Sequence, residues 1–154
     1  MSTEERAVAM AHFTEPAAVE TVANARHWVT AFAQEHGMTG DRCTDLALAV
    51  SEAVTNAVLH AYPADEPGDV VVDTATDGDC LSVRVTDHGR GGAGTSRGLG
   101  LGLPLIARIA DRVEHGPGAN GVGTVILMEL EMGGVADAAP VAGARTPDRL
   151  PDDG

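Results

Sequence analysis

Three polar residues interrupt an apolar segment at a spacing that suggests chemistry: Glu52, Asn56 and His60. Residues four apart lie on the same face of an α-helix, so the three side chains would line up. The Asn side chain can offer its carbonyl oxygen to a hard cation such as Mg²⁺, while the Glu holds one of the ion's waters. For this segment alone a solvated polar face is the simpler interpretation, and His60 is better explained as a structural or helix-end residue.

A second candidate group is Asp87, which ends the strand-like run LSVRVTD and precedes two glycines. A carboxylate at a strand end can accept a hydrogen bond from the exocyclic amino group of adenine, and glycines let the backbone come close. A turn is the alternative, because Asp and Gly are the commonest turn residues. Gly89, Gly91 and Gly94 also fit the dinucleotide fingerprint G-x-G-x-x-G. We reject that interpretation because no helix opens at the last glycine and the preceding element is a hairpin.

Gly98, Gly100 and Gly102 form a third feature, since they alternate with leucines just before a predicted helix. Exposed backbone N–H groups at a helix N-terminus, with no Cβ in the way, can bind a phosphate. A flexible turn would explain one such glycine but is a poor explanation for three in alternation.

Hydrophobic periodicity and turn residues predict the elements that would position these groups. In chain order these are a strand over residues 6–13, a helix from Pro16 to about His36 that Gly37 terminates, a helix from near Asp41 to a stop before Pro63, the strands VVVDTAT and LSVRVTD joined at Asp77-Gly78-Asp79, a helix from Pro104 to Gly116-Pro117, and the strand GTVILMEL. The order β-α-α-β-β-α-β predicts an α+β two-layer sandwich, with a mixed, mostly antiparallel sheet and the helices on one face.

Two apolar stripes are expected to face the core, which must be aliphatic because only 3% of the residues are aromatic. The stripe of the second helix is Ala49, Val50, Ala53, Val54, Ala57 and Val58, and that of the third is Leu103, Ile106, Ala110 and Val113. We expect one domain over residues 1–132. Residues 133–154 carry no periodic apolar positions, which predicts a disordered tail.

The net charge of −13, with 23 acidic and 10 basic residues, argues against nucleic acid as a partner. The acidic surface serves either solubility or a basic protein partner. No apolar run is long enough to cross a membrane, and the N-terminus lacks a signal-peptide core. We therefore expect a cytoplasmic protein that does not enter membranes.

Taken together, E-x-x-x-N, D-x-G-x-G, G-x-G-x-G and a final G-T resemble the four sequence boxes of the GHKL (Bergerat-fold) ATPases. The runs SEAVTNAVLHAY and GLGLPLI are most similar to the anti-sigma-factor serine kinases, and the resemblance covers roughly residues 6–131. It implies ATP and Mg²⁺ as cofactors and the Bergerat fold. It also implies a role for each matching residue: Glu52 as the catalytic carboxylate, Asn56 as the Mg²⁺ ligand, Asp87 as the adenine acceptor, Gly89 and Gly91 around the adenine, Gly98, Gly100 and Gly102 near the phosphates, and Thr124 supporting the adenine through Asp87 or a water.

The resemblance further implies an anti-sigma factor that forms a homodimer, binds a sigma factor and phosphorylates a serine of an anti-anti-sigma (STAS-type) protein. Only residues 92–97 separate Gly91 from Gly98, where the kinases usually carry a longer lid, although Arg97 could still reach the phosphates. Two alternatives follow. One is an anti-sigma module that binds nucleotide without phosphoryl transfer, and the other is a detached histidine-kinase-like ATPase domain.

Overall fold

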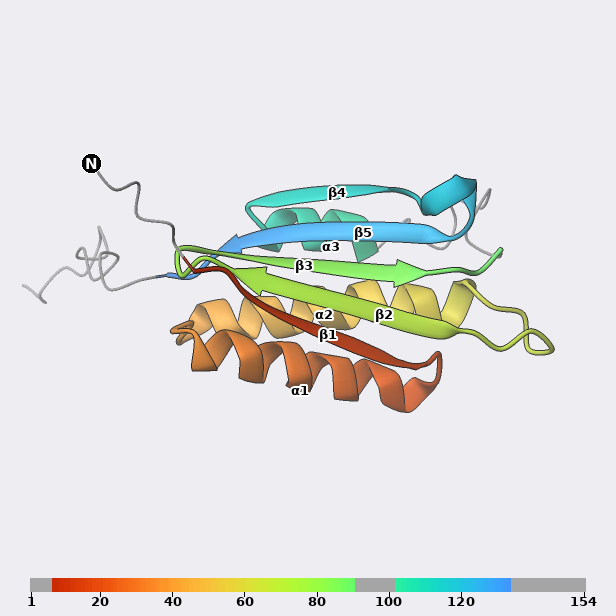
Figure 1. Ribbon diagram of the computed structural model, residues 1–154, viewed down its shortest axis with the longest axis horizontal. Coiled ribbons are helices and arrows are strands. Elements are labelled where there is room, and N and C mark those ends of the chain that lie inside the picture. Colours follow the sequence, from red (N-terminus) through yellow and green to blue (C-terminus); the bar gives the residue numbers. More distant parts are fainter. Residues whose placement is uncertain (1–6, 91–101, 134–154) are drawn as a thin grey trace, which may run out of the picture.

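Five strands form a single sheet in the described part of the chain, residues 7–90 and 102–133 of a computed structural model (Figure 1). The elements are β1 Ala9–Pro16, α1 Val19–Glu35, α2 Asp41–His60, β2 Asp69–Thr76, β3 Cys80–Asp87, α3 Gly102–Ile109, β4 Arg112–Pro117, a 3₁₀ turn Ala119–Gly121 and β5 Thr124–Glu131. The strands are ordered β1-β2-β3-β5-β4, and each of the four pairings is antiparallel. The predicted α+β class is confirmed.

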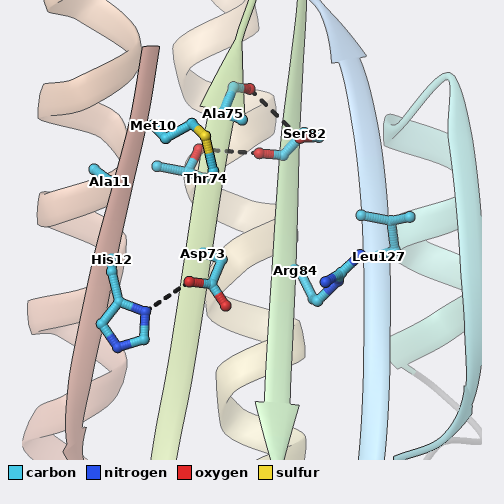
Figure 2. A pocket seen from close by; sticks show the side chains of 9 residues that line it. All are labelled: Met10, Ala11, His12, Asp73, Thr74, Ala75, Ser82, Arg84 and Leu127. Carbon is cyan, nitrogen blue, oxygen red and sulfur yellow. Dashed lines mark hydrogen bonds and ion pairs between the residues drawn. The ribbon is translucent and has the colours of Figure 1, made fainter. Parts of the chain in front are cut away.

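Every second residue along the three central strands is buried. Because successive side chains of a strand point to opposite faces, one face of the sheet carries an apolar layer. Its members are Val70, Val72, Leu81, Val83, Val85, Ile126, Met128 and Leu130. The helices cover this face, and Figure 2 views the sheet from its uncovered side with the helices behind it. The predicted placement of the helices on one face is confirmed.

The central helix is α2, which packs against both α1 and α3. Its predicted stripe faces the core: Ala49, Val50, Ala53, Val54 and Ala57 are buried, and Val58 is partly buried. The two predicted chain reversals are also confirmed. Gly37, with φ of +106°, follows α1, and Gly78, with φ of +97°, lies in the hairpin between β2 and β3. Both need the left-handed backbone conformation that glycine adopts without a steric penalty.

The predicted bounds of the first strand and of the first helix were wrong. The first strand is Ala9–Pro16 rather than residues 6–13, and Pro16 ends this strand instead of opening a helix. Pro16 pairs with Asp69 at the end of an edge strand, a position where a missing N–H removes no bond from the interior of the sheet. The helix α1 then begins at Val19. Ala18 is the N-cap of this helix, and its N–H donates a hydrogen bond to the hydroxyl of Thr21.

The third helix is also shorter than predicted, because residues 112–117 form the extra strand β4. Val113, which was expected on the helix, lies on β4 opposite Met128. Pairing with β5 begins just before β4, where the N–H of Asp111 donates to the carbonyl oxygen of Glu129 at 2.9 Å. Residues 134–154 of the tail lie outside the described residues, so the disorder expected for the tail stays a prediction.

Candidate nucleotide-binding site

Asp87 is the one buried carboxylate among the described residues, with 7% of its surface exposed. It ends β3 and lies in register with Val70 on β2 and Thr124 on β5. Side chains alternate between the two faces along β3, and this alternation places the Asp87 side chain on the helix-covered face. We call this end of the sheet, where α2 ends, β3 ends and β5 begins, the Asp87 end; it is on the right in Figure 1.

Two backbone N–H groups bind the Asp87 carboxylate. Gly89 donates to Oδ1 at 3.1 Å, and the backbone N–H of Thr124 donates across the strand pair. Burial raises the pKa of Asp87 above its usual value, although both N–H donors and the nearby His88 oppose that shift. A carboxylate offers about four lone-pair positions, so these two donors leave acceptor capacity for an exocyclic amino group.

Close backbone contacts explain the glycines around Asp87. A Cβ on Gly89 would lie 1.9 Å from the carbonyl oxygen of Ala61, the C-cap of α2. A Cβ on Gly123 would lie 2.0 Å from the carbonyl oxygen of Asp87, and Gly123 also has φ of +78°. Gly123 was not among the candidate site residues, although it is the glycine of the G-T motif. Thr124 contacts Asp87 through its backbone N–H, which any residue except proline would provide.

The polar face of α2 carries the predicted magnesium ligand. Glu52 and Asn56 are both partly buried, whereas His60 is exposed at the last position of the helix. The side-chain nitrogen of Asn56 is buried and has no hydrogen-bond partner among the described residues. A buried N–H donor without a partner costs about 1–3 kcal/mol, so a ligand that offers an acceptor to this nitrogen, such as a phosphate oxygen, would remove that cost.

The polar residues on this face of α2 are too few to enclose a metal ion by themselves, which suits an Mg²⁺ ion that is bound together with a nucleotide. The described residues contain no cluster of three or more His, Cys, Asp or Glu side chains that could enclose a metal. Magnesium is usually held by one or two protein oxygens together with substrate phosphates and waters. The Asn56 carbonyl oxygen, with Glu52 one turn away, could supply that small protein share.

The α2 face and Asp87 are connected through the end of the helix. Asn56 precedes Ala61 by five residues, or about 7.5 Å along the axis, and Ala61 contacts Gly89. The helix α3 begins at Gly102, and in Figure 1 its first turn is the end nearer to the Asp87 end. The other predicted phosphate-loop residues, Gly91, Arg97, Gly98 and Gly100, lie outside the described residues.

The sequence patterns did not point to Tyr62, which lies just beyond α2. Its hydroxyl group accepts a hydrogen bond from the N–H of His88 at 2.8 Å and donates one to the carbonyl oxygen of Asp69 at 2.7 Å. Burial raises the pKa of Tyr62, so the hydroxyl keeps its proton at neutral pH. The only sequence signal would have been a lone tyrosine between a helix and a proline.

A separate pocket of about 380 Å³ lies on the uncovered face of the sheet (Figure 2). There His12 and Asp73 are hydrogen bonded at 2.6 Å, and both are well exposed. Asp87 does not line this pocket, because its side chain lies on the opposite, helix-covered face. The pocket is therefore not part of the predicted nucleotide site.

Comparison with known proteins identifies the family. The model of the histidine kinase-like ATPase domain matches residues 15–130, and the chain belongs to this family. The chain is 35% identical over 126 residues to a serine-protein kinase RsbW of Bacillus licheniformis, covering 82% of this chain and 76% of that protein. It is 42% identical over 67 residues to an anti-sigma F factor of Clostridium perfringens, covering 44% of this chain and 48% of that protein.

A further relative, a serine-protein kinase RsbW of Listeria monocytogenes, is 39% identical over 74 residues, or 48% of this chain. The chain spans about half the length of the Listeria and Clostridium relatives. Among solved structures, that of the RsbU and RsbW domains of a Mycobacterium tuberculosis protein matches with a TM-score of 0.63 and 24% identity. That match covers 79% of this chain and 32% of the other, and it supports the fold. No helix in residues 7–90 or 102–133 is long and apolar enough to cross a membrane.

Proposed function

We propose that this chain is an ATP-dependent serine-protein kinase that acts as an anti-sigma factor in the cytoplasm. Its substrate would be a serine of an anti-anti-sigma protein of the STAS type, and it would bind a sigma factor as a homodimer. The observation that carries the proposal is the similarity to a serine-protein kinase over 82% of the chain. The buried Asp87 carboxylate, with acceptor capacity left for an amino group, supports adenine as the base.

Each site residue then has a defined task. Asp87 accepts a hydrogen bond from the adenine amino group, and the N–H groups of Gly89 and Thr124 hold its carboxylate in place. Asn56 offers its carbonyl oxygen to Mg²⁺, which would neutralise charge on the β- and γ-phosphates. The N-terminus of α3 at Gly102, with Gly98 and Gly100 before it, would bind the phosphates. Gly91 would border the adenine, and Arg97 would approach the γ-phosphate.

Glu52 would accept a hydrogen bond from the serine hydroxyl of the partner protein and align it with the γ-phosphate. The serine oxygen then forms a bond to the γ-phosphorus while the bond from phosphorus to the ADP oxygen breaks. The hydroxyl proton leaves through the Glu52 carboxylate to solvent. Alignment, rather than strong proton abstraction, is the larger contribution expected in phosphoryl transfer.

The proposal is tested by incubating the chain with labelled ATP, Mg²⁺ and a purified STAS-type protein, and by locating the label by mass spectrometry. We expect phosphoserine on the partner. Glu52→Gln should abolish transfer while ATP and sigma-factor affinities stay within about twofold, because the amide keeps the size of the side chain but lacks the negative charge with which the carboxylate holds and aligns the serine hydroxyl. Normal transfer by this variant would remove Glu52 from the mechanism.

One sequence feature favours a second candidate function, an anti-sigma module that binds the nucleotide but does not transfer its γ-phosphoryl group. Only residues 92–97 separate Gly91 from Gly98, and a short segment covers little of the triphosphate. In that case ATP would bind and no partner would become labelled. An acid-labile label on a histidine of another chain would instead support a detached histidine-kinase-like ATPase domain.

A further inference from the structure

The hydroxyl group of Tyr62 joins three segments that are distant in sequence. It follows α2, accepts the N–H of His88 beyond β3, and donates to the carbonyl oxygen of Asp69 at the start of β2. One hydroxyl therefore satisfies one backbone donor and one backbone acceptor. His88 lies just beyond β3, and Asp69 pairs with Pro16, which has no N–H to donate.

The aromatic ring of Tyr62 is held in place by close packing. A Cβ on Gly68 would lie 2.0 Å from ring atom Cε1, so the backbone of residue 68 lies directly against the ring. Gly68 in turn accepts a hydrogen bond from the N–H of Ala17 at 2.8 Å. Because the ring packs against a backbone segment that is itself hydrogen bonded, this contact limits the positions that the hydroxyl group can take.

The Asp87–Gly89 turn, defined as residues 87–89, receives this constraint directly. Tyr62 binds the N–H of His88, the next residue after Asp87. Gly89 closes the turn by donating to the Asp87 carboxylate, and its α-carbon packs against the carbonyl of Ala61. Residues 61 and 62 thus contact two successive residues of the turn that orients the carboxylate.

We infer that Tyr62 is a positioning residue for nucleobase recognition: through the N–H of His88 it holds the Asp87–Gly89 turn so that the Asp87 carboxylate faces the adenine amino group. The inference rests on the proposed role of Asp87 in binding adenine. A hydrogen bond weakens steeply when its donor and acceptor are misaligned, so a looser turn reduces recognition of the base.

The chain offers a matched control for the loss of such a hydroxyl. Thr76 also bridges two backbone groups, since its hydroxyl donates to the carbonyl of Cys80 at 2.8 Å and accepts the N–H of Gly78 at 3.0 Å. It lies at the β2–β3 hairpin, at the opposite end of β3 from Asp87. Thr76→Val and Tyr62→Phe therefore each remove one bridging hydroxyl, one far from the turn and one against it.

The test is calorimetric titration of Mg·ATP and Mg·GTP into the wild-type chain, Tyr62→Phe and Thr76→Val, at a temperature where circular dichroism finds all three folded. We expect the wild type and Thr76→Val to prefer ATP over GTP by at least roughly tenfold, and Tyr62→Phe to lose most of that preference. A loss of stability alone would not change the ratio of two affinities. An unchanged ratio in Tyr62→Phe overturns the inference.

Asp87→Asn separates this inference from the proposed function. If the wild type shows no preference, or if Asp87→Asn keeps it, the role of Asp87 itself fails. If Asp87→Asn loses the preference and Tyr62→Phe keeps it, only the inference about Tyr62 fails. Should Tyr62→Phe not fold, Gly89→Ala provides the second variant, because its Cβ would push the turn away from Ala61; it is expected to lose the preference, and a wild-type ratio would overturn the inference.

Discussion

The two ends of β5 each place a backbone N–H against an aspartate, yet the two aspartates have opposite electrostatic environments. At the Asp87 end, Thr124 donates to a buried carboxylate whose pKa is raised by burial. At the other end, which we call the Asp111 end, Glu131 donates to Asp111 at 2.7 Å. That N–H and the guanidinium of Arg42, at 2.6 Å, lower the pKa of Asp111.

The difference between the ends is in how the charge is compensated. Arg42 also donates to the carbonyl oxygen of Glu131 at 3.0 Å, so it ties the start of α2 to the end of β5. The Asp111 end is paired within the protein and half exposed, which suits a structural contact. The Asp87 carboxylate is buried among backbone donors, so a ligand that supplies another donor improves its environment. The poorly compensated end is therefore the one expected to bind a ligand.

The largest effects in this comparison are expected for substitutions at the proposed nucleotide site, and Asn56→Ala is one of them. ATP affinity in Mg²⁺ should fall by about 10- to 100-fold, because one metal ligand is lost. EDTA should bring the wild type down to the same level. The free protein should lose little stability, since the Asn56 amide nitrogen has no partner among the described residues. Calorimetry and thermal melts measure both quantities, and equal ATP affinity with and without EDTA would contradict the magnesium assignment.

Asp111→Ala is expected to do the reverse: it should lower the stability of the protein and leave ATP affinity nearly unchanged. It removes the contacts to Arg42 and to the N–H of Glu131, and should lower the free energy of unfolding by about 1 kcal/mol, since a half-exposed ion pair is screened by solvent. ATP affinity should stay within about twofold of wild type. Urea unfolding and nucleotide titration check the two parts. A loss of ATP affinity without a loss of stability would reverse the roles assigned to the two ends.

The smallest effect is a difference in pH dependence. The folded pKa of Asp111 is lowered from 3.8, so its contribution is present above that value and is lost as pH falls through the lowered pKa. The folded pKa of Asp87 is raised from 3.8, so its contribution is fully present below that value and is lost as pH rises through the raised pKa. Urea unfolding of Asp87→Asn and Asp111→Asn over this acidic range should give difference curves of opposite slope relative to wild type. Parallel curves would contradict one of the two shifts.

The parts of the fold that sequence patterns predict are those with strong apolar periodicity. The stripe from Ala49 to Ala57 and the hairpin around Gly78 were predicted correctly. The strand β4 was missed because Val113 is its one strongly apolar residue, and its position depends on backbone pairing with β5. Pro16 was assigned to a helix because its fixed φ suits a helix start as well as a strand end.

The candidate site was predictable to the extent that motif residues carry it. Asp87 and Gly89 come from the D-x-G-x-G motif and Thr124 from the final G-T motif, and the structure brings the two motifs together at one end of the sheet. Gly123 and Tyr62 were missed because they act through backbone contacts with residues distant in sequence. The contact between Tyr62 and His88 joins positions 26 residues apart, a distance at which neither periodicity nor turn chemistry gives a signal.

The claim that the Asp87 end binds the nucleotide is tested most directly by titrating Mg·ATP into Asp87→Asn and Asp111→Asn in parallel. Each variant replaces one carboxylate oxygen with an amide nitrogen that cannot accept a hydrogen bond. We predict that Asp87→Asn weakens ATP binding by about 10- to 100-fold, because a charged acceptor for the adenine amino group is lost. Asp111→Asn should bind ATP within about twofold of wild type. Equal affinities for the two variants, or a weaker affinity for Asp111→Asn, would contradict the account.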